Sequence, residues 1–101
     1  MKKVFISVGM NGRPCGDVMD DIARAKENIT HKYGPLNLYI THNYNCKFPD
    51  GGERLYCLGE AVKKLGDCDA CYFVKDWEKH KGCLVEYLVC KLYGIEIIVE
   101  V

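Results

Sequence analysis

The chain has 101 residues, the length of one ordinary domain, and 49% of them are apolar, which argues against a disordered tail. Equal numbers of basic and acidic residues, 14 of each, argue against broad electrostatic binding to nucleic acid or to an anionic membrane. No apolar run approaches the roughly 20 residues that span a bilayer, and no signal peptide is recognisable. We therefore expect a single cytoplasmic domain over residues 1–101.

A β-branched and aromatic run over Lys3–Val8 predicts the first strand. A helical stripe of apolar residues follows within Asp17–Tyr33, with Asp17 in the position of an N-cap. The members of this stripe are Val18, Ile22, Ala25 and Ile29. Leu36–Thr41 then predicts a second strand, and a polar loop over residues 42–53 follows it.

The second half of the chain repeats this alternation. Its predicted elements are a helix over Arg54–Leu65, a strand over Asp69–Val74, a helix over Gly82–Tyr93 and a strand over Ile95–Val101. The apolar stripe of the middle helix comprises Leu55, Leu58, Val62 and Leu65. Such alternation implies an α/β fold with a parallel sheet and right-handed crossovers. Two strand orders are plausible, and we favour 2-1-3-4, with the first helix alone on one face and the other two on the opposite face.

Seven cysteines are many for this length, and their odd number without an export signal indicates reduced thiols. Most lie in apolar periodic segments, where cysteine acts as a small hydrophobic side chain. Cys68 and Cys71 form the one CxxC pair, and no second ligand pair accompanies them. His42 with Cys46 is a weak remaining pair. We therefore predict neither a metal site nor a cofactor.

In a sheet of order 2-1-3-4, ligands bind at the carboxyl ends of the strands, beside the switch point between strands 1 and 3. The loop there has three glycines and an arginine between a strand and a helix, a combination that suits a phosphate. Its candidate ligand-binding residues are Ser7, Gly9, Met10, Asn11, Gly12 and Arg13. A tight strand–helix turn accounts for the glycines about as well, because the loop is neither a Walker A nor a GxGxxG motif.

Glu86 is the most informative acidic residue. The residues three and four positions away from it on the predicted helix are Gly82, Cys83, Val89 and Cys90. None of them is basic, so Glu86 has no partner for an i,i+4 ion pair. A carboxyl group in these apolar surroundings should have a raised pKa or contact a ligand. The alternative is an exposed acid in the first helical turn, favoured by the helix dipole.

The connection between the third strand and the third helix supplies further candidates. Asp76 and His80 could act as an acid or contact a phosphate, and Gly82 opens the helix. Trp77 could stack on a base or a sugar, or it could cover the core. A solvated loop position accounts for His80 and His42 slightly better than a functional role.

Two stretches of the chain carry a recognisable pattern. The first, over residues 3–12, reads Ile6-Ser7-x-x-Met10-x-Gly12. The second comprises Cys68-Asp69-Ala70, Trp77-Glu78-Lys79, Gly82-x-x-x-Glu86 and Gly94-Ile95-x-Ile97-Ile98. Together they resemble the small nucleoside 2-deoxyribosyltransferase-like proteins, which include an uncharacterised branch common in bacteriophages and their hosts. The resemblance covers both ends of the chain, and residues 35–54 have no clear match.

This resemblance implies a flavodoxin-like Rossmann variant that binds a nucleoside or nucleotide. In the enzymes of the family, the glutamate that matches Glu86 attacks the anomeric carbon of the sugar and forms a glycosyl-enzyme. A second acid helps the base to leave, and the glycine loop lies near the sugar or its phosphate. Two helper positions depart from the pattern: His80 stands where Asp or Ser is usual, and Glu60 is the acid nearest to the expected Asp on the second helix.

Two functions follow as expectations. The first is cleavage or exchange of the N-glycosidic bond of a deoxynucleoside or its monophosphate, with Glu86 as nucleophile and Asp76 or His80 as the candidate acid or phosphate contact. The second is binding of a nucleotide or an ADP-ribose-type signal without turnover, for example by a phage anti-defence protein. A structural subunit is a third, plainer option. We also expect a homodimer or larger homo-oligomer, because one helix cannot cover a whole sheet face.

Overall fold

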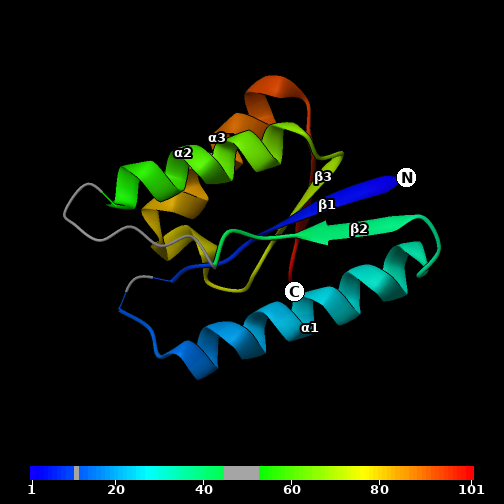
Figure 1. Cartoon of the computed structure of the whole chain (residues 1–101), viewed down its shortest axis with the longest axis horizontal. Helices are drawn as coiled ribbons and strands as arrows, with labels where there is room; N and C mark the ends of the chain where they lie inside the picture. Colours follow the sequence, from blue (N-terminus) through cyan, green and yellow to red (C-terminus); the bar gives the residue numbers. More distant parts are fainter. Residues whose placement is uncertain (11, 45–52) are drawn as a thin grey trace.

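In the computed structural model of the protein, residues 1–10, 12–44 and 53–101 are described, without the side chains of residues 53 and 54. Within these ranges four parallel strands form one sheet in the order β2-β1-β3-β4 (Figure 1). The strands are β1 (Lys2–Ser7), β2 (Leu38–Thr41), β3 (Ala70–Phe73) and β4 (Glu96–Val99). The α-helices described are α1 (Cys15–Tyr33), α2 (Glu53–Gly66) and α3 (Lys81–Tyr93). The predicted α/β class, strand order and helix number are confirmed.

The structure differs from the prediction at the start of α1 and at Leu55 in α2. The helix α1 begins at Cys15, and the Pro14 carbonyl accepts hydrogen bonds from the backbone N–H of Asp17 and Val18. Proline fixes a φ that suits the start of a helix, so Asp17 lies in the first turn and is not the N-cap. In α2, Leu55 is 78% exposed because the first turns of the helix lie beyond the carboxyl ends of the strands (Figure 1).

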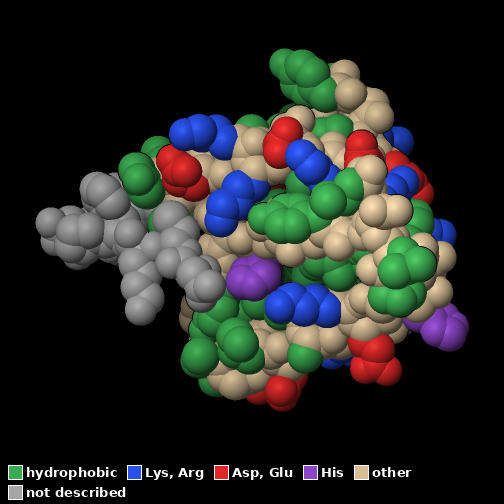
Figure 2. Space-filling model, turned by 45° about the vertical axis from the view of Figure 1, so that its right-hand side comes forward, with side chains coloured by type: hydrophobic (Ala, Val, Ile, Leu, Met, Phe, Trp, Pro, Cys, Tyr) green, Lys and Arg blue, Asp and Glu red, His purple; other side chains and the backbone are tan. Residues whose placement is uncertain are grey.

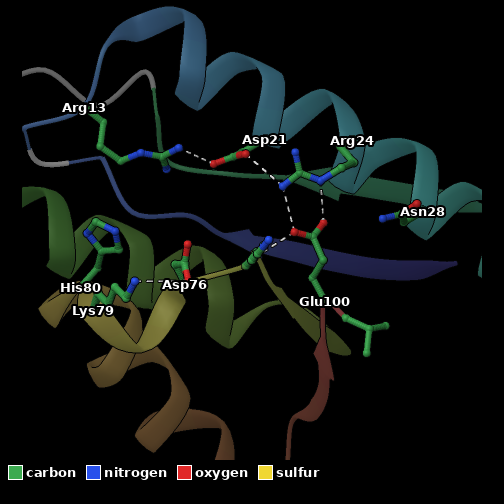
Figure 3. A pocket seen from close by; sticks show the side chains of 10 residues that line it. Arg13, Asp21, Arg24, Asn28, Asp76, Lys79, His80 and Glu100 are labelled. Atoms are coloured by element: carbon green, nitrogen blue, oxygen red, sulfur yellow. Dashed lines mark hydrogen bonds and ion pairs between the residues drawn. The ribbon is translucent and has the colours of Figure 1, made fainter.

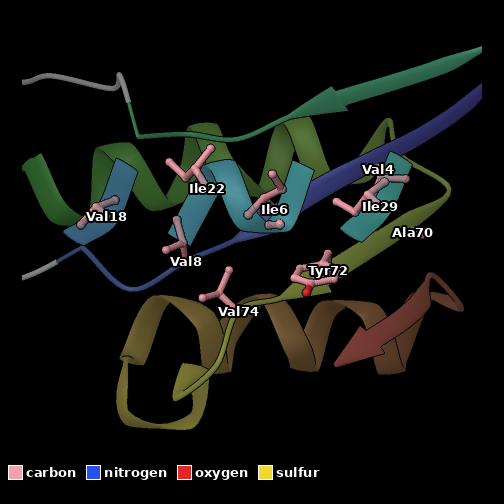
Figure 4. Close-up of a cluster of buried hydrophobic side chains, with 10 residues drawn as sticks. Val4, Ile6, Val8, Val18, Ile22, Ile29, Ala70, Tyr72 and Val74 are labelled. Atoms are coloured by element: carbon pink, nitrogen blue, oxygen red, sulfur yellow. The ribbon is translucent and has the colours of Figure 1, made fainter. Parts of the chain in front are cut away.

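The sheet is covered on both faces. Alternate side chains of β1 point to opposite sides, with Val4 and Ile6 toward α1 and Phe5 toward α2 and α3. The α1 side is a continuous apolar core (Figure 4), built from Val4, Ile6, Val8, Val18, Ile22, Ala25, Ile29, Ala70, Tyr72 and Val74. The predicted stripe of α1 is therefore confirmed, and α1 lies alone on its face of the sheet.

This core changes the argument for an oligomer. We expected the α1 face of β3 to need a partner, but Ala70, Tyr72 and Val74 are buried within the single chain. At β4 the same face carries Glu96, which pairs with Lys2 on β1 at 2.8 Å. The homo-oligomer stays a prediction, and this face of the sheet no longer gives a reason for it.

Candidate functional site

The last residue of β1, Ser7, is hydrogen-bonded to a buried carboxyl group, that of Glu86. The Ser7 side chain points toward α3, and its Oγ donates a 2.6 Å hydrogen bond to Oε1 of Glu86. Glu86 is 6% exposed and lies on the buried stripe of α3 together with Cys83 and Cys90. The predicted burial of Glu86 is thus confirmed, and the exposed-acid alternative is wrong.

Burial controls the protonation of these groups. It raises the pKa of Glu86 to about 7, against the opposing effect of the hydrogen bond from Ser7. It also raises the pKa of Cys83 to about 11. Near neutral pH the Glu86 carboxyl therefore exchanges between its charged and neutral forms, whereas the neighbouring thiol stays protonated and is a poor nucleophile.

Gly9 and His80 are in close contact just beyond the end of β1. A Cβ atom placed on Gly9 would overlap the His80 ring. A side chain at this position would therefore force the His80 ring to move, and glycine allows the close approach. At Gly12 the requirement is conformational, because its φ is +70°. Both glycines serve the shape of the loop.

A cavity of about 720 Å³ lies on the α1 side of this edge (Figure 3). One wall comes from α1 and the other from the segment between β3 and α3, with the residues after β4 at the side. Its lining residues are Arg13, Asp21, Arg24, Asn28, Lys75, Asp76, Lys79, His80, Glu100 and Val101. Arg13, Asp76 and His80 are sequence-predicted site residues that line this cavity.

A chain of ion pairs runs along the cavity wall. Arg13 donates to the Gly9 carbonyl at 2.7 Å and to Asp21 at 2.6 Å. Asp21 also accepts from Arg24 at 2.9 Å, and Arg24 pairs in turn with Glu100. Burial alone would raise the pKa of Glu100, but hydrogen bonds from Arg24, the Lys75 backbone and Tyr72 outweigh it and lower the pKa to about 2. Arg13 thus holds together the loop between β1 and α1, through its hydrogen bond to the Gly9 carbonyl.

Three further predicted residues, Trp77, Met10 and Gly82, lie outside the cavity lining. Trp77 stacks on the Tyr87 ring with centroids 4.6 Å apart and packs against Phe73, so it covers the α2/α3 core. Met10 packs against the α1-side core. The helix α3 begins at Lys81, one residue before the predicted start at Gly82, and a Cβ on Gly82 would be 4.0 Å from a Leu58 methyl. Asn11 lies outside the described residues.

Sequence reasoning singled out none of the other residues of the cavity wall, among them Arg24, Lys75 and Glu100. Arg24 and Asp21 are three positions apart on α1, a spacing that could have indicated an ion pair. Their connection to Glu100 joins residues 76 positions apart and has no local signature. His42 accepts a hydrogen bond from the Tyr44 backbone and does not line the cavity, and Cys46 lies outside the described residues.

Comparison of the chain with protein-family models, with curated proteins and with solved structures gives no match. Over the described ranges, no group of three or more His, Cys, Asp or Glu side chains is arranged to hold a metal ion. No helix within them is both long and apolar enough to cross a membrane.

Proposed function

We propose that the protein binds a nucleoside or nucleotide at the carboxyl edge of the sheet, with the sugar directed toward Glu86. The observation that carries this proposal is the buried Ser7–Glu86 pair, which lies where the strand order reverses between β1 and β3. Ligands of doubly wound sheets bind at this reversal. A buried carboxyl group whose pKa is about 7 is suited to accept a hydrogen bond from a sugar hydroxyl or to react with the sugar.

If turnover occurs, Glu86 supplies the nucleophile. Its carboxylate forms a bond to the anomeric carbon while the bond from that carbon to the base nitrogen breaks, and the base leaves with a proton from an acid. Water then hydrolyses the glycosyl ester, or a second base displaces Glu86. The first step requires that the hydrogen bond from Ser7 to Oε1 leave the carboxylate free to reach the sugar.

One observation favours binding without turnover. Asp76, the candidate acid, lines the cavity on the α1 side and forms a 3.5 Å ion pair with Lys79. Glu86 instead lies on the α3 side, hydrogen-bonded to Ser7. Within the described part of the chain, no hydrogen bond joins Asp76 to Glu86, whereas a proton donor for the leaving base must be close to the sugar. Sequestration of a nucleotide or an ADP-ribose-type ligand is therefore the second candidate function.

Calorimetric titration with deoxynucleosides and their 5′-monophosphates tests binding, and chromatographic detection of free base tests turnover. We expect Glu86→Gln to weaken binding at least ten-fold and to abolish any base release. Glu60→Gln is the matched control, because Glu60 is an acid on the surface of α2 paired with Lys63. Equal affinities in the wild type and Glu86→Gln would overturn the proposed site. Intact affinity for the wild type without base release would establish the second candidate.

A further inference from the structure

The cavity beside α1 holds more positive than negative side chains. Four cationic side chains line it, those of Arg13, Arg24, Lys75 and Lys79, against the three carboxylates of Asp21, Asp76 and Glu100. The arginines and two of the carboxylates neutralise one another, because Asp21 accepts from both arginines and Glu100 accepts from Arg24. These four residues form a fixed wall whose charges are already paired.

The two lysines are different. The Lys75 ammonium has no ion-pair or hydrogen-bond partner among the described residues, whereas the Lys75 backbone donates a hydrogen bond to Glu100. Lys79 is 3.5 Å from Asp76, and both side chains are more than half exposed. An ion pair that long and that exposed contributes little stability. Both ammonium groups are therefore available to a ligand at little cost.

We propose that this cavity binds the phosphate group of an anionic ligand, held by Lys75, Lys79 and His80. Lysines provide point charges that suit a phosphate, and the imidazole adds a hydrogen-bonding group at the same wall. The volume of about 720 Å³ leaves room for more than an inorganic ion. This proposal places the phosphate beside α1. Arg13, which the sequence predicted as a phosphate ligand, is part of the cavity wall and is already paired with Asp21.

His80 connects this site to the buried carboxyl group. It lines the cavity, and its ring lies against Gly9, two residues beyond Ser7 at the end of β1. A ligand with its phosphate at the two lysines could extend past His80 toward the Ser7–Glu86 pair. This extension rests on the proposed function, and it names the ligand class as a phosphorylated nucleoside. The phosphate site itself stands without it.

The test uses inorganic phosphate and pyrophosphate as probes, titrated at constant ionic strength and followed by the backbone amide signals of the protein. We expect saturable shifts at Lys75, Asp76 and His80. The double variant Lys75→Ala/Lys79→Ala should weaken pyrophosphate binding on the order of ten- to 100-fold. A second double variant, Lys63→Ala/Lys91→Ala, removes the same charge from the other side of the sheet and should leave the affinity unchanged.

Equal losses in both double variants, or shifts that spread over the surface without saturating, would overturn the phosphate site. The same variants then separate this inference from the proposed function. Nucleoside binding that depends on Glu86, without pyrophosphate binding, would refute the phosphate site alone. Pyrophosphate binding that depends on Lys75 and Lys79, without affinity for any nucleoside or nucleotide, would keep the phosphate site and refute the proposed function.

Discussion

Arg24 and Glu100 are joined by two charge-assisted hydrogen bonds, 3.0 Å from Nε to Oε2 and 2.8 Å from Nη2 to Oε1. The same carboxylate accepts from the Tyr72 hydroxyl at 2.8 Å and from the Lys75 backbone at 2.9 Å. One buried carboxylate therefore ties α1 to β3, to the segment after β3 and to the residue after β4. These are the elements that surround the cavity.

Removal of this connection should destabilise the protein. Arg24→Ala leaves Glu100 buried without its counter-ion, and we expect the free energy of unfolding at pH 7 to fall by about 2 kcal/mol. Arg24→Lys should recover only part of this loss, because lysine cannot reproduce the two-pronged geometry. Denaturant unfolding measures both effects. Lys26→Ala, an exposed change on the same helix, is the control, and a similar small effect in both alanine variants would contradict the prediction.

The stability of the protein should depend on pH through Glu86. Burial raises the pKa of this carboxyl from 4.5 to about 7, so the folded protein prefers the neutral form. The resulting stability is fully present below pH 4.5 and is lost as the pH rises through 7. We expect Glu86→Gln, which is neutral at every pH, to exceed the wild type in unfolding free energy by about 3 kcal/mol at pH 8.

At pH 4 the same two proteins should be about equally stable, because the wild-type carboxyl is then neutral. Thermal or denaturant unfolding at several pH values provides the measurement. Glu60→Gln again serves as the control, since its side chain is on the surface and should show no such trend. A difference between Glu86→Gln and the wild type that stays constant from pH 4 to pH 8 would be incompatible with a buried, titrating carboxyl.

The contact between Gly9 and His80 predicts a non-additive pair of substitutions. Gly9→Ala should displace the His80 ring and lower the unfolding free energy by about 1–3 kcal/mol. In the background of His80→Ala the same change should cost much less, because the ring is no longer in the way. A double-mutant cycle of denaturant unfolding gives the coupling directly. Additive effects of the two substitutions would show that the methyl group is accommodated elsewhere.

An outer stripe of α3 is where we expect self-association. Leu84, Leu88 and Leu92 are exposed at a four-residue spacing, among other apolar side chains on the surface (Figure 2 shows several such groups on one face). We predict by light scattering a mass above the 11.5 kDa of one chain at micromolar concentration. Leu88→Glu should restore the single-chain mass. A wild-type mass of one chain at every concentration would exclude the oligomer.

Local periodicity was enough to predict most of the fold. The strand β1 and the stripe of α1 are both read from short-range patterns, and Glu86 was singled out because its helix offers it no basic partner. The same reasoning failed at Leu55, because the spacing of apolar residues on a helix does not say whether a strand lies beneath that turn. It also gave no sign of the pairing between Arg13 and Asp21, because that pairing depends on how the loop folds back.

The cavity wall lay beyond sequence reasoning for a different reason. A pairing such as that of Arg24 with Glu100 depends on the packing of α1 across β3 toward β4, and many acids and bases along the chain could meet in principle. Only the assembled sheet selects one pair among them. The short turn η1 (Trp77–Lys79) likewise follows from the packing of Trp77 on Phe73 and Tyr87, which lie on different elements.

The central place of β1 has a consequence for the chain during its synthesis. β1 pairs with β2 on one side and with β3 on the other, and β3 begins only at Ala70. Until β3 has been made, β1 can pair only with β2, and a two-stranded sheet has little stability in water. The apolar side chains of β1 that pack against later elements are then exposed. A nascent chain of this protein should therefore need shielding by a chaperone until the third strand emerges from the ribosome.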